Sequence, residues 1–253
     1  MQILRPKESP DEILAKVQSF TRAVQLRSKA PRCSDDLISG LEKWVSGEGS
    51  SIFLVRVGAR AEENAREFAA DVIKLLKPLP FGVIWNLSWN RFRRSISPFA
   101  DMIKSLIFQA LKLDPSLLQE YPDEINIAKF MSSHTEAEWA ALLTHLFSRL
   151  SKCFIIIEAE DVFQAQREDL EWPRRFLQLF QSLVDQAEVS GNLLKILLIG
   201  YHTSVSTLQS VSSRKNRITS SVRSPILVPP RMRRLLLPGG KPATNWRHMK
   251  PKF

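Results

Sequence analysis

Residues 51–76 read SIFLVRVGARAEENAREFAADVIKLL, and this stretch decides the fold class. Its first seven residues form a mostly apolar run that Gly58 ends, a pattern typical of a strand buried on both faces. Behind the glycine, apolar side chains recur over 61–76 at the spacing of an amphipathic helix. A buried strand that leads directly into a helix predicts an α/β fold with a parallel sheet.

The same alternation of strands and helices is predicted along the rest of the chain. Two capping boxes, Ser9 with Glu12 and Thr135 with Glu138, mark helix starts. Apolar strands that alternate with amphipathic helices require helices on both faces of a mostly parallel sheet, so we expect a three-layer αβα domain. The predicted strands cover 51–57, 81–87, 153–157 and 193–199; the predicted helices begin near residues 9, 34, 61, 97, 135 and 173, with short helices and turns over 114–134.

The positive charge of the chain is confined to its end. The 253 residues include 36 Lys and Arg against 26 Asp and Glu, which gives a net charge of +10. Residues 200–253 hold 11 of these basic residues and no acidic one, so residues 1–199 carry 25 basic and 26 acidic side chains, a net charge of −1. A nearly neutral body excludes a uniformly basic nucleic-acid coat protein.

Three segments follow from this division of charge and pattern. We expect a helical lead-in at 1–33, an α/β domain at 34–203 and a tail at 204–253. Because the tail is rich in serine, proline and basic residues, we expect most of it to be disordered. A short apolar run at 226–228 is a candidate edge strand.

The composition argues against several classes of protein. No apolar run approaches the roughly 18–20 residues of a membrane span, and the first residues lack the apolar core of a secretory signal. Cys33 and Cys153 alone form neither a disulfide scaffold nor a zinc site, and the four histidines have no metal-ligand spacing. We therefore expect an intracellular, cytoplasmic protein with no bound metal, in which Cys153 is a buried apolar side chain.

Several segments together resemble a known family. Trp44 before a Gly/Ser turn and the segments SIFLVRVGARAEENAREFA, VIWNLS, DMIKSLIFQAL, WAALLTHL and FIIIEAED resemble the P-loop core of fungal STAND-type (NACHT-like) NTPases, in a degenerate branch. The resemblance covers about residues 34–200 and rests on the order of elements and on hydrophobicity. It implies a P-loop NTPase-like sheet with the first strand central and a nucleotide site beyond the strands that lead to Gly58 and Glu158.

The P-loop signature itself is largely lost. A working P-loop reads G-x-x-x-x-G-K-[ST]: backbone N–H groups cradle the phosphates, the lysine neutralises them and the hydroxyl holds Mg²⁺. Counted from Gly58, the second glycine is replaced by Glu63, the lysine by Asn64 and the hydroxyl residue by Ala65. The remaining candidates for neutralising a triphosphate are Arg56, Arg60 and Arg66.

The acidic end of the third strand also departs from the resembled family. Active members end this strand in an aspartate that organises Mg²⁺, often followed by a second acid. Here the positions are Glu158, Glu160 and Asp161, which we interpret as a solvated strand end or the relic of a metal site. The arginine that NACHT-like relatives often place after the fourth strand is absent from Gly200-Tyr201-His202. Metal-assisted hydrolysis therefore lacks most of its parts.

We expect a non-catalytic STAND/NACHT-like module, a pseudo-NTPase with a role in interaction or regulation and no required cofactor. The sequence identifies no protein partner. An alternative is a switch that binds Mg-ATP or Mg-GTP weakly through Arg60 and Glu158.

A second alternative places function in the basic tail, which would bind nucleic acid or another polyanion. Its two clusters are also typical of a bipartite nuclear-import signal. A basic loop before the fourth predicted helix is either a solvated loop or a contact for phosphate or RNA. The tail clusters comprise Arg214, Lys215, Arg217, Arg231, Arg233 and Arg234, and the loop comprises Arg91, Arg93 and Arg94.

Overall fold

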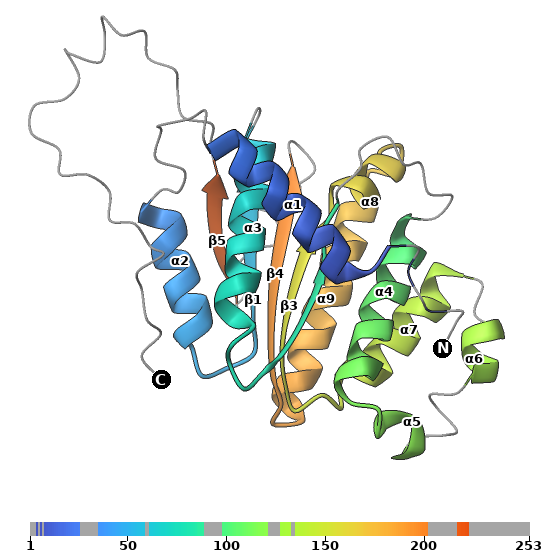
Figure 1. The fold of residues 1–253 in the computed structure, drawn as a ribbon. Coiled ribbons are helices and arrows are strands. Elements are labelled where there is room, and N and C mark those ends of the chain that lie inside the picture. Colours follow the sequence, from blue (N-terminus) through green and yellow to red (C-terminus); the bar gives the residue numbers. More distant parts are fainter. Residues whose placement is uncertain are drawn as a thin grey trace, which may run out of the picture.

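The centre of the molecule is an all-parallel five-stranded sheet. The computed structural model describes residues 4, 6, 8–25, 35–58, 61–88, 98–120, 127–132, 135–201 and 217–222. The strand order is β2-β3-β4-β1-β5, and every neighbouring pair is parallel (Figure 1). The strands are β1 (Ser51–Val57), β2 (Gly82–Asn86), β3 (Lys152–Glu158), β4 (Leu193–Tyr201) and β5 (Arg217–Val222). The α/β class with a parallel sheet is confirmed.

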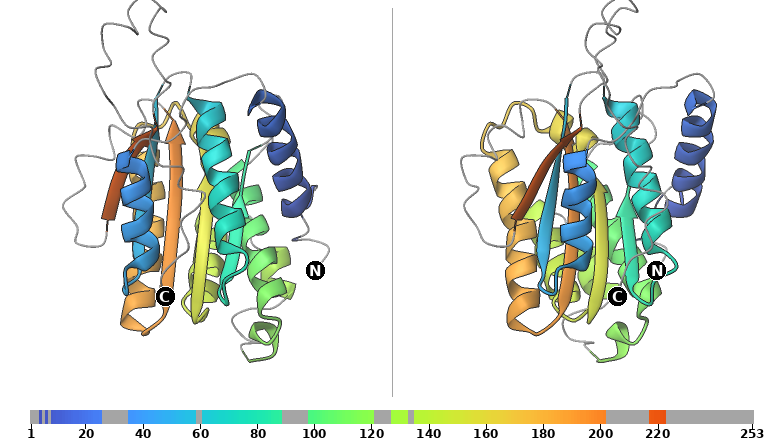
Figure 2. Two further views of the ribbon diagram at one scale, coloured as in Figure 1. Left: turned by 60° about the vertical axis from the view of Figure 1, so that its left-hand side comes forward. Right: turned by 90° about the vertical axis from the view of Figure 1, so that its left-hand side faces the viewer.

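Helices cover both faces of this sheet (Figure 2). One apolar cluster joins the sheet to α1, α2 and α3, and a second joins it to α4, α7, α8 and α9. In the described ranges, no helix has both the length and the hydropathy needed to cross a membrane. The helices are α1 (Pro10–Gln25), α2 (Asp35–Ser46), α3 (Glu62–Leu76), α4 (Pro98–Leu113), α5 (Leu117–Glu120), α6 (Ile127–Ser132), α7 (Glu136–Phe147), α8 (Glu160–Ala165) and α9 (Trp172–Val189).

β1 shows how the sequence pattern produces the layers. Successive side chains of a strand point to opposite faces of the sheet. Ile52 and Leu54 therefore belong to the cluster with α4 and α9, whereas Phe53, Val55 and Val57 belong to the cluster with α2 and α3. Both faces need apolar residues, which is why this strand reads as an almost continuous apolar run. β1 lies inside the sheet, between β4 and β5, and β4 is the middle strand.

β5 lies further along the chain than any strand that the sequence analysis assigned to the α/β domain. It pairs in parallel with β1, with Ile52 opposite Arg217 and Val57 opposite Val222. The expectation of a tail beginning at 204 is therefore wrong for residues 217–222, which complete the sheet. The candidate edge strand at 226–228 lies outside the described residues.

A glycine lets α2 approach β1 closely. A Cβ atom built on Gly40 would lie 2.9 Å from Cζ of Phe53, a separation that real Cβ atoms essentially never show. It would also lie 3.7 Å from a methyl group of Ile218 in β5. Gly40 therefore marks the point where α2 covers the β1–β5 side of the sheet.

Both predicted capping boxes are confirmed. At the start of α1, the N–H of Glu12 donates to Oγ of Ser9 over 3.2 Å, and the N–H of Ser9 donates to Glu12 over 3.1 Å. At the start of α7, Oγ1 of Thr135 accepts from the N–H of Glu138 over 3.2 Å, and Glu138 accepts from the N–H of Thr135 over 2.9 Å. Each box satisfies two backbone donors that the helix itself leaves without partners.

Replacement of Thr135 by alanine is expected to lower the free energy of unfolding by about 1 kcal/mol. The change removes the acceptor for the N–H of Glu138 and leaves the apolar face of α7 intact. Urea denaturation measures this loss. Thr135→Ser, which keeps the hydroxyl, is the matched control and should stay close to the wild type; equal losses in both variants would contradict the capping role.

Candidate functional site

The carboxyl edge of the sheet holds the two predicted halves of the nucleotide site on strands that one other strand separates. Gly58 follows β1, Glu158 ends β3, and β4 separates these strands. After β1 the chain enters α3 on one face, and after β3 it enters α8 and α9 on the other face. Open parallel sheets bind ligands beyond their carboxyl ends, where successive connections lead to opposite faces. The candidate site is therefore the region around Gly58 and Glu158.

Glu158 is buried here and paired with a cation of the protein. Its side chain is 0% exposed, and Nε of Arg66 lies 2.9 Å from its Oε1. Arg66 belongs to α3, and its side chain is only 12% exposed. The other carboxylate oxygen, Oε2, accepts the backbone N–H of Ser88 over 3.0 Å. Both oxygens of Glu158 are thus engaged by protein donors.

Ser88 links Glu158 to Asp161. It follows β2, which lies beside β3 in the sheet, and its hydroxyl donates to Oδ2 of Asp161 in the first turn of α8. Glu160 takes a different partner, because its Oε1 accepts from Nε2 of Gln164 over 2.6 Å on the same helix. Within the part of the chain that the structure describes, no group of three or more His, Cys, Asp or Glu is arranged to hold a metal. Glu158 and Asp161 are therefore joined through Ser88, whereas Glu160 bonds to Gln164.

The turn between β1 and α3 uses its own backbone groups. The N–H of Ala61 donates to the carbonyl oxygen of Gly58 over 3.1 Å, and the N–H of Ala65 donates to the carbonyl oxygen of Ala61 over 3.0 Å. The Ala61 amide is therefore committed to closing the turn. Arg60 lies outside the described residues.

The three substituted signature positions have different surroundings on α3. Glu63 is exposed, Asn64 is half-buried and Ala65 is fully buried in the apolar cluster with α1 and α2. Glu62 and Glu63 place negative charge in the first turn of the helix. This charge suits the helix dipole, and it opposes a phosphate at the same positive end.

From the sequence, Arg66 was predicted only as a counter-charge for a bound triphosphate, and the contacts of Ser88 with Glu158 and Asp161 were not predicted. In the structure the partner of Arg66 is Glu158, which lies 92 positions away in the chain. No local spacing signals a contact at that separation. Arg56, the other described candidate for this counter-charge, belongs to β1 and lies opposite Gly200 of β4 and Ser221 of β5.

Arg217 is part of the folded sheet, which corrects its assignment to a tail cluster. It opens β5, and its Nε donates to Oε1 of Gln181 on α9 over 2.8 Å. The other basic positions lie outside the described residues: Arg91, Arg93, Arg94, Arg214, Lys215, Arg231, Arg233 and Arg234.

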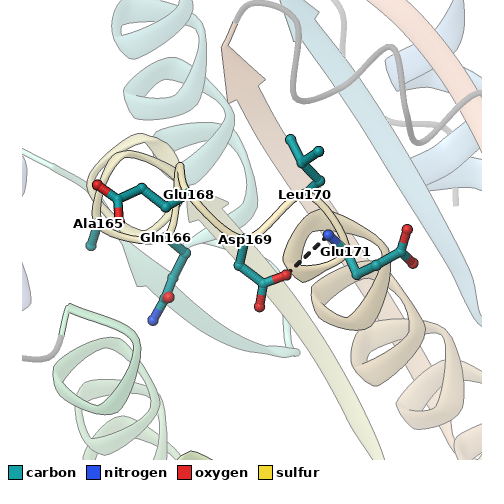
Figure 3. A pocket seen from close by; sticks show the side chains of 6 residues that line it. All are labelled: Ala165, Gln166, Glu168, Asp169, Leu170 and Glu171. Atoms are coloured by element: carbon teal, nitrogen blue, oxygen red, sulfur yellow. Dashed lines mark hydrogen bonds between the residues drawn. The ribbon is translucent and has the colours of Figure 1, made fainter.

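A shallow depression lies at the connection between α8 and α9 (Figure 3). Asp169 lies two residues before the N-cap of α9, and its Oδ1 accepts the N–H groups of Glu171 over 3.0 Å and of Trp172 over 3.1 Å. The hydrogen bond from Arg175 holds the pKa of Asp169 below its usual range. The depression shares no lining residue with the Arg66–Glu158–Ser88–Asp161 network, and it is lined by Ala165, Gln166, Glu168, Asp169, Leu170 and Glu171.

A buried lysine lies at the opposite, amino edge of the sheet. Lys195 of β4 is 1% exposed, and its Nζ donates to Oγ of Ser51 over 3.2 Å. A Cβ atom on Gly47, just after α2, would lie 3.2 Å from Nζ, so the glycine leaves room for the amine. Burial lowers the pKa of Lys195 to about 8. In the described part of the chain no carboxylate pairs with this amine.

Comparison of the chain with protein-family models and with curated proteins found no match.

Proposed function

We propose that this protein is a non-catalytic STAND/NACHT-like module that acts through interaction or regulation and does not hydrolyse a nucleotide. The observation that carries the proposal is the state of Glu158. It occupies the position at which the resembled family holds Mg²⁺, yet its side chain is fully buried and both oxygens are engaged by Arg66 and Ser88.

The chemistry of Mg²⁺ supports this proposal. Mg²⁺ demands nearly octahedral oxygen ligands and usually keeps several of its waters. A magnesium ion at Glu158 would share the carboxylate with the guanidinium of Arg66 or displace it, and in either case two cations would lie close together. Two like unit charges about 4 Å apart repel by about 4 kcal/mol at an effective dielectric constant of 20, which opposes metal binding at this carboxylate.

The turn after β1 supports the proposal independently. Phosphate binding by a P-loop depends on backbone N–H groups that point at the ligand. Here the Ala61 amide bonds to Gly58, Ala65 is packed in the core, and Glu63 adds negative charge to the start of α3. The resemblance implies that the first strand is central; β1 is an interior strand, but the central strand is β4. A parallel α/β sheet that lacks the phosphate-binding groups of the resembled family favours a scaffold over an enzyme.

The alternative of a weak Mg-ATP or Mg-GTP switch is tested by melting experiments. A ligand that binds only the folded state stabilises it by about 2.7 kcal/mol at a concentration 100 times its Kd. We expect millimolar Mg-ATP or Mg-GTP to leave the melting temperature of the full chain unchanged, and phosphate release to equal that of a protein-free blank. A rise in melting temperature with either nucleotide, absent with magnesium alone, would contradict the proposal.

A designed variant tests whether the backbone between β1 and α3 can still bind phosphate as a P-loop does. Glu63→Gly, Asn64→Lys and Ala65→Ser together rebuild the signature from Gly58. Nucleotide affinity gained by this variant supports descent from a P-loop, and its absence indicates that the backbone of the turn has diverged. The same changes made with Arg66→Ala separate the effect of the loop from that of the Arg66–Glu158 pair.

A further inference from the structure

A glutamine side chain bonds to the outer edge of the sheet at β2. Gln109 belongs to α4 and is 8% exposed. Its Oε1 accepts the backbone N–H of Trp85 over 3.1 Å, and its Nε2 donates to the backbone carbonyl of the same residue over 2.8 Å. The amide thus bonds to both polar groups of one strand residue.

Two further contacts fix the orientation of this amide. Nε2 of Gln109 also lies 3.2 Å from the carbonyl oxygen of Ser105, one turn earlier in α4, and 3.4 Å from its hydroxyl. A nitrogen suits two oxygen acceptors, whereas an oxygen in its place would face them without a proton. The assignment of donor and acceptor in Gln109 therefore follows from four contacts.

These contacts matter because β2 is a terminal strand. It pairs with β3 on one side, and in the described part of the chain no strand lies on the other. The outward N–H and C=O groups of a terminal strand are a template for pairing with another chain. A side-chain amide offers the same donor and acceptor as a peptide group, so Gln109 occupies the place that a neighbouring strand would take beside Trp85.

The sequence of β2 explains why this edge needs such protection. Gly82–Asn86 reads GVIWN and contains no charged residue and no proline. Charged side chains and prolines are the usual means by which proteins prevent pairing at an edge, and uncharged segments rich in β-branched and aromatic residues are prone to it. Two such strands from two copies of the chain would meet without like charges opposite each other.

We propose that Gln109 closes the β2 edge against strand addition, and that a second copy of the chain pairs there through its own β2 once the amide is removed. This inference is independent of the proposed loss of nucleotide chemistry, because it involves no residue of the Arg66–Glu158 network.

The test compares two Gln→Met variants of the full chain. Gln109→Met keeps the length of the side chain and removes both polar groups, and Gln178→Met makes the same change at an exposed position of α9. Sedimentation velocity over a concentration series should show concentration-dependent dimers for Gln109→Met beyond any seen for the wild type, and Gln178→Met should match the wild type. Amide exchange of Trp85 should become about tenfold faster in Gln109→Met if that variant is held in its monomeric form.

Two results would overturn the proposal. One is a Gln109→Met protein that is folded and associates no more than the wild type. The other needs no variant: if the Trp85 amide of the wild type exchanges as fast as an exposed amide, Gln109 does not close the edge. The second measurement decides the question even if Gln109→Met fails to fold.

Discussion

Replacement of Arg66 by methionine is expected to lower the free energy of unfolding by about 3–5 kcal/mol. The variant leaves the Glu158 carboxylate fully buried, while the Ser88 N–H still donates to its Oε2. An ionised group without its counter-charge loses far more from desolvation than an exposed one. Urea denaturation at pH 7 measures the loss, which is large against the total stability of a domain.

Two comparisons show whether the loss belongs to the ion pair. The double variant Arg66→Met, Glu158→Gln removes both charges while keeping an acceptor for Ser88, so it should recover most of the stability. Lys16→Met breaks the pair between Lys16 and Glu8 near the surface, where pairs contribute about 0–1 kcal/mol. A loss for Arg66→Met no larger than that for Lys16→Met would show that Glu158 does not depend on Arg66.

Replacement of Lys195 by methionine is expected to raise the free energy of unfolding at pH 7 by about 1–3 kcal/mol. Lys195 is fully buried, and its pKa falls from 10.5 to about 8 because burial disfavours the charged amine. At pH 7 the lysine is protonated in both the folded and unfolded states, so the folded state bears the full cost of a buried charge. Methionine fills a similar volume without that cost.

The same variant predicts a specific pH dependence. Between about pH 8 and pH 10.5 the folded protein has released the proton of Lys195 while the unfolded chain still holds it. Stability rises with pH wherever the unfolded state binds more protons. The free energy of unfolding of the wild type should therefore rise relative to that of the variant throughout this window. Chemical denaturation at several pH values measures the difference in free energy of unfolding between the wild type and the variant. Groups that titrate equally in both proteins do not contribute to this difference. A difference that stays constant from pH 7 to 11 would contradict the shifted pKa.

The interior strands were predictable because burial on both faces of the sheet requires apolar residues within each strand, and this pattern is visible in a short stretch of sequence. β1, β3 and β4 have helices on both faces, so each reads as an apolar run with boundaries close to those observed. β5 was missed because an edge strand needs less burial: RITSSV has two apolar residues in a serine-rich surrounding. β5 pairs with β1 through backbone groups, which leave no apolar pattern in the sequence.

For the candidate site too, features that follow from a parallel sheet were predictable, and contacts between segments distant in the chain were not. That Gly58 and Glu158 lie on one edge follows from a parallel sheet, whose strands all end on the same side. The Arg66–Glu158 pair and the link through Ser88 were not predictable, since they join three segments far apart in the chain. Such contacts depend on the strand order, which the periodicity of apolar residues does not specify.

The position of β1 has a consequence for the synthesis of the chain on the ribosome. β1 ends at Val57, whereas its two neighbours in the sheet begin at Leu193 and Arg217. β1 therefore leaves the ribosome long before β4 or β5 has been synthesised. Strand pairing between segments so far apart in the chain is also slow. During that interval both sides of β1 are unpaired, the condition in which nascent chains aggregate or engage chaperones. A chain cut at residue 203 would leave one side of β1 without its partner permanently.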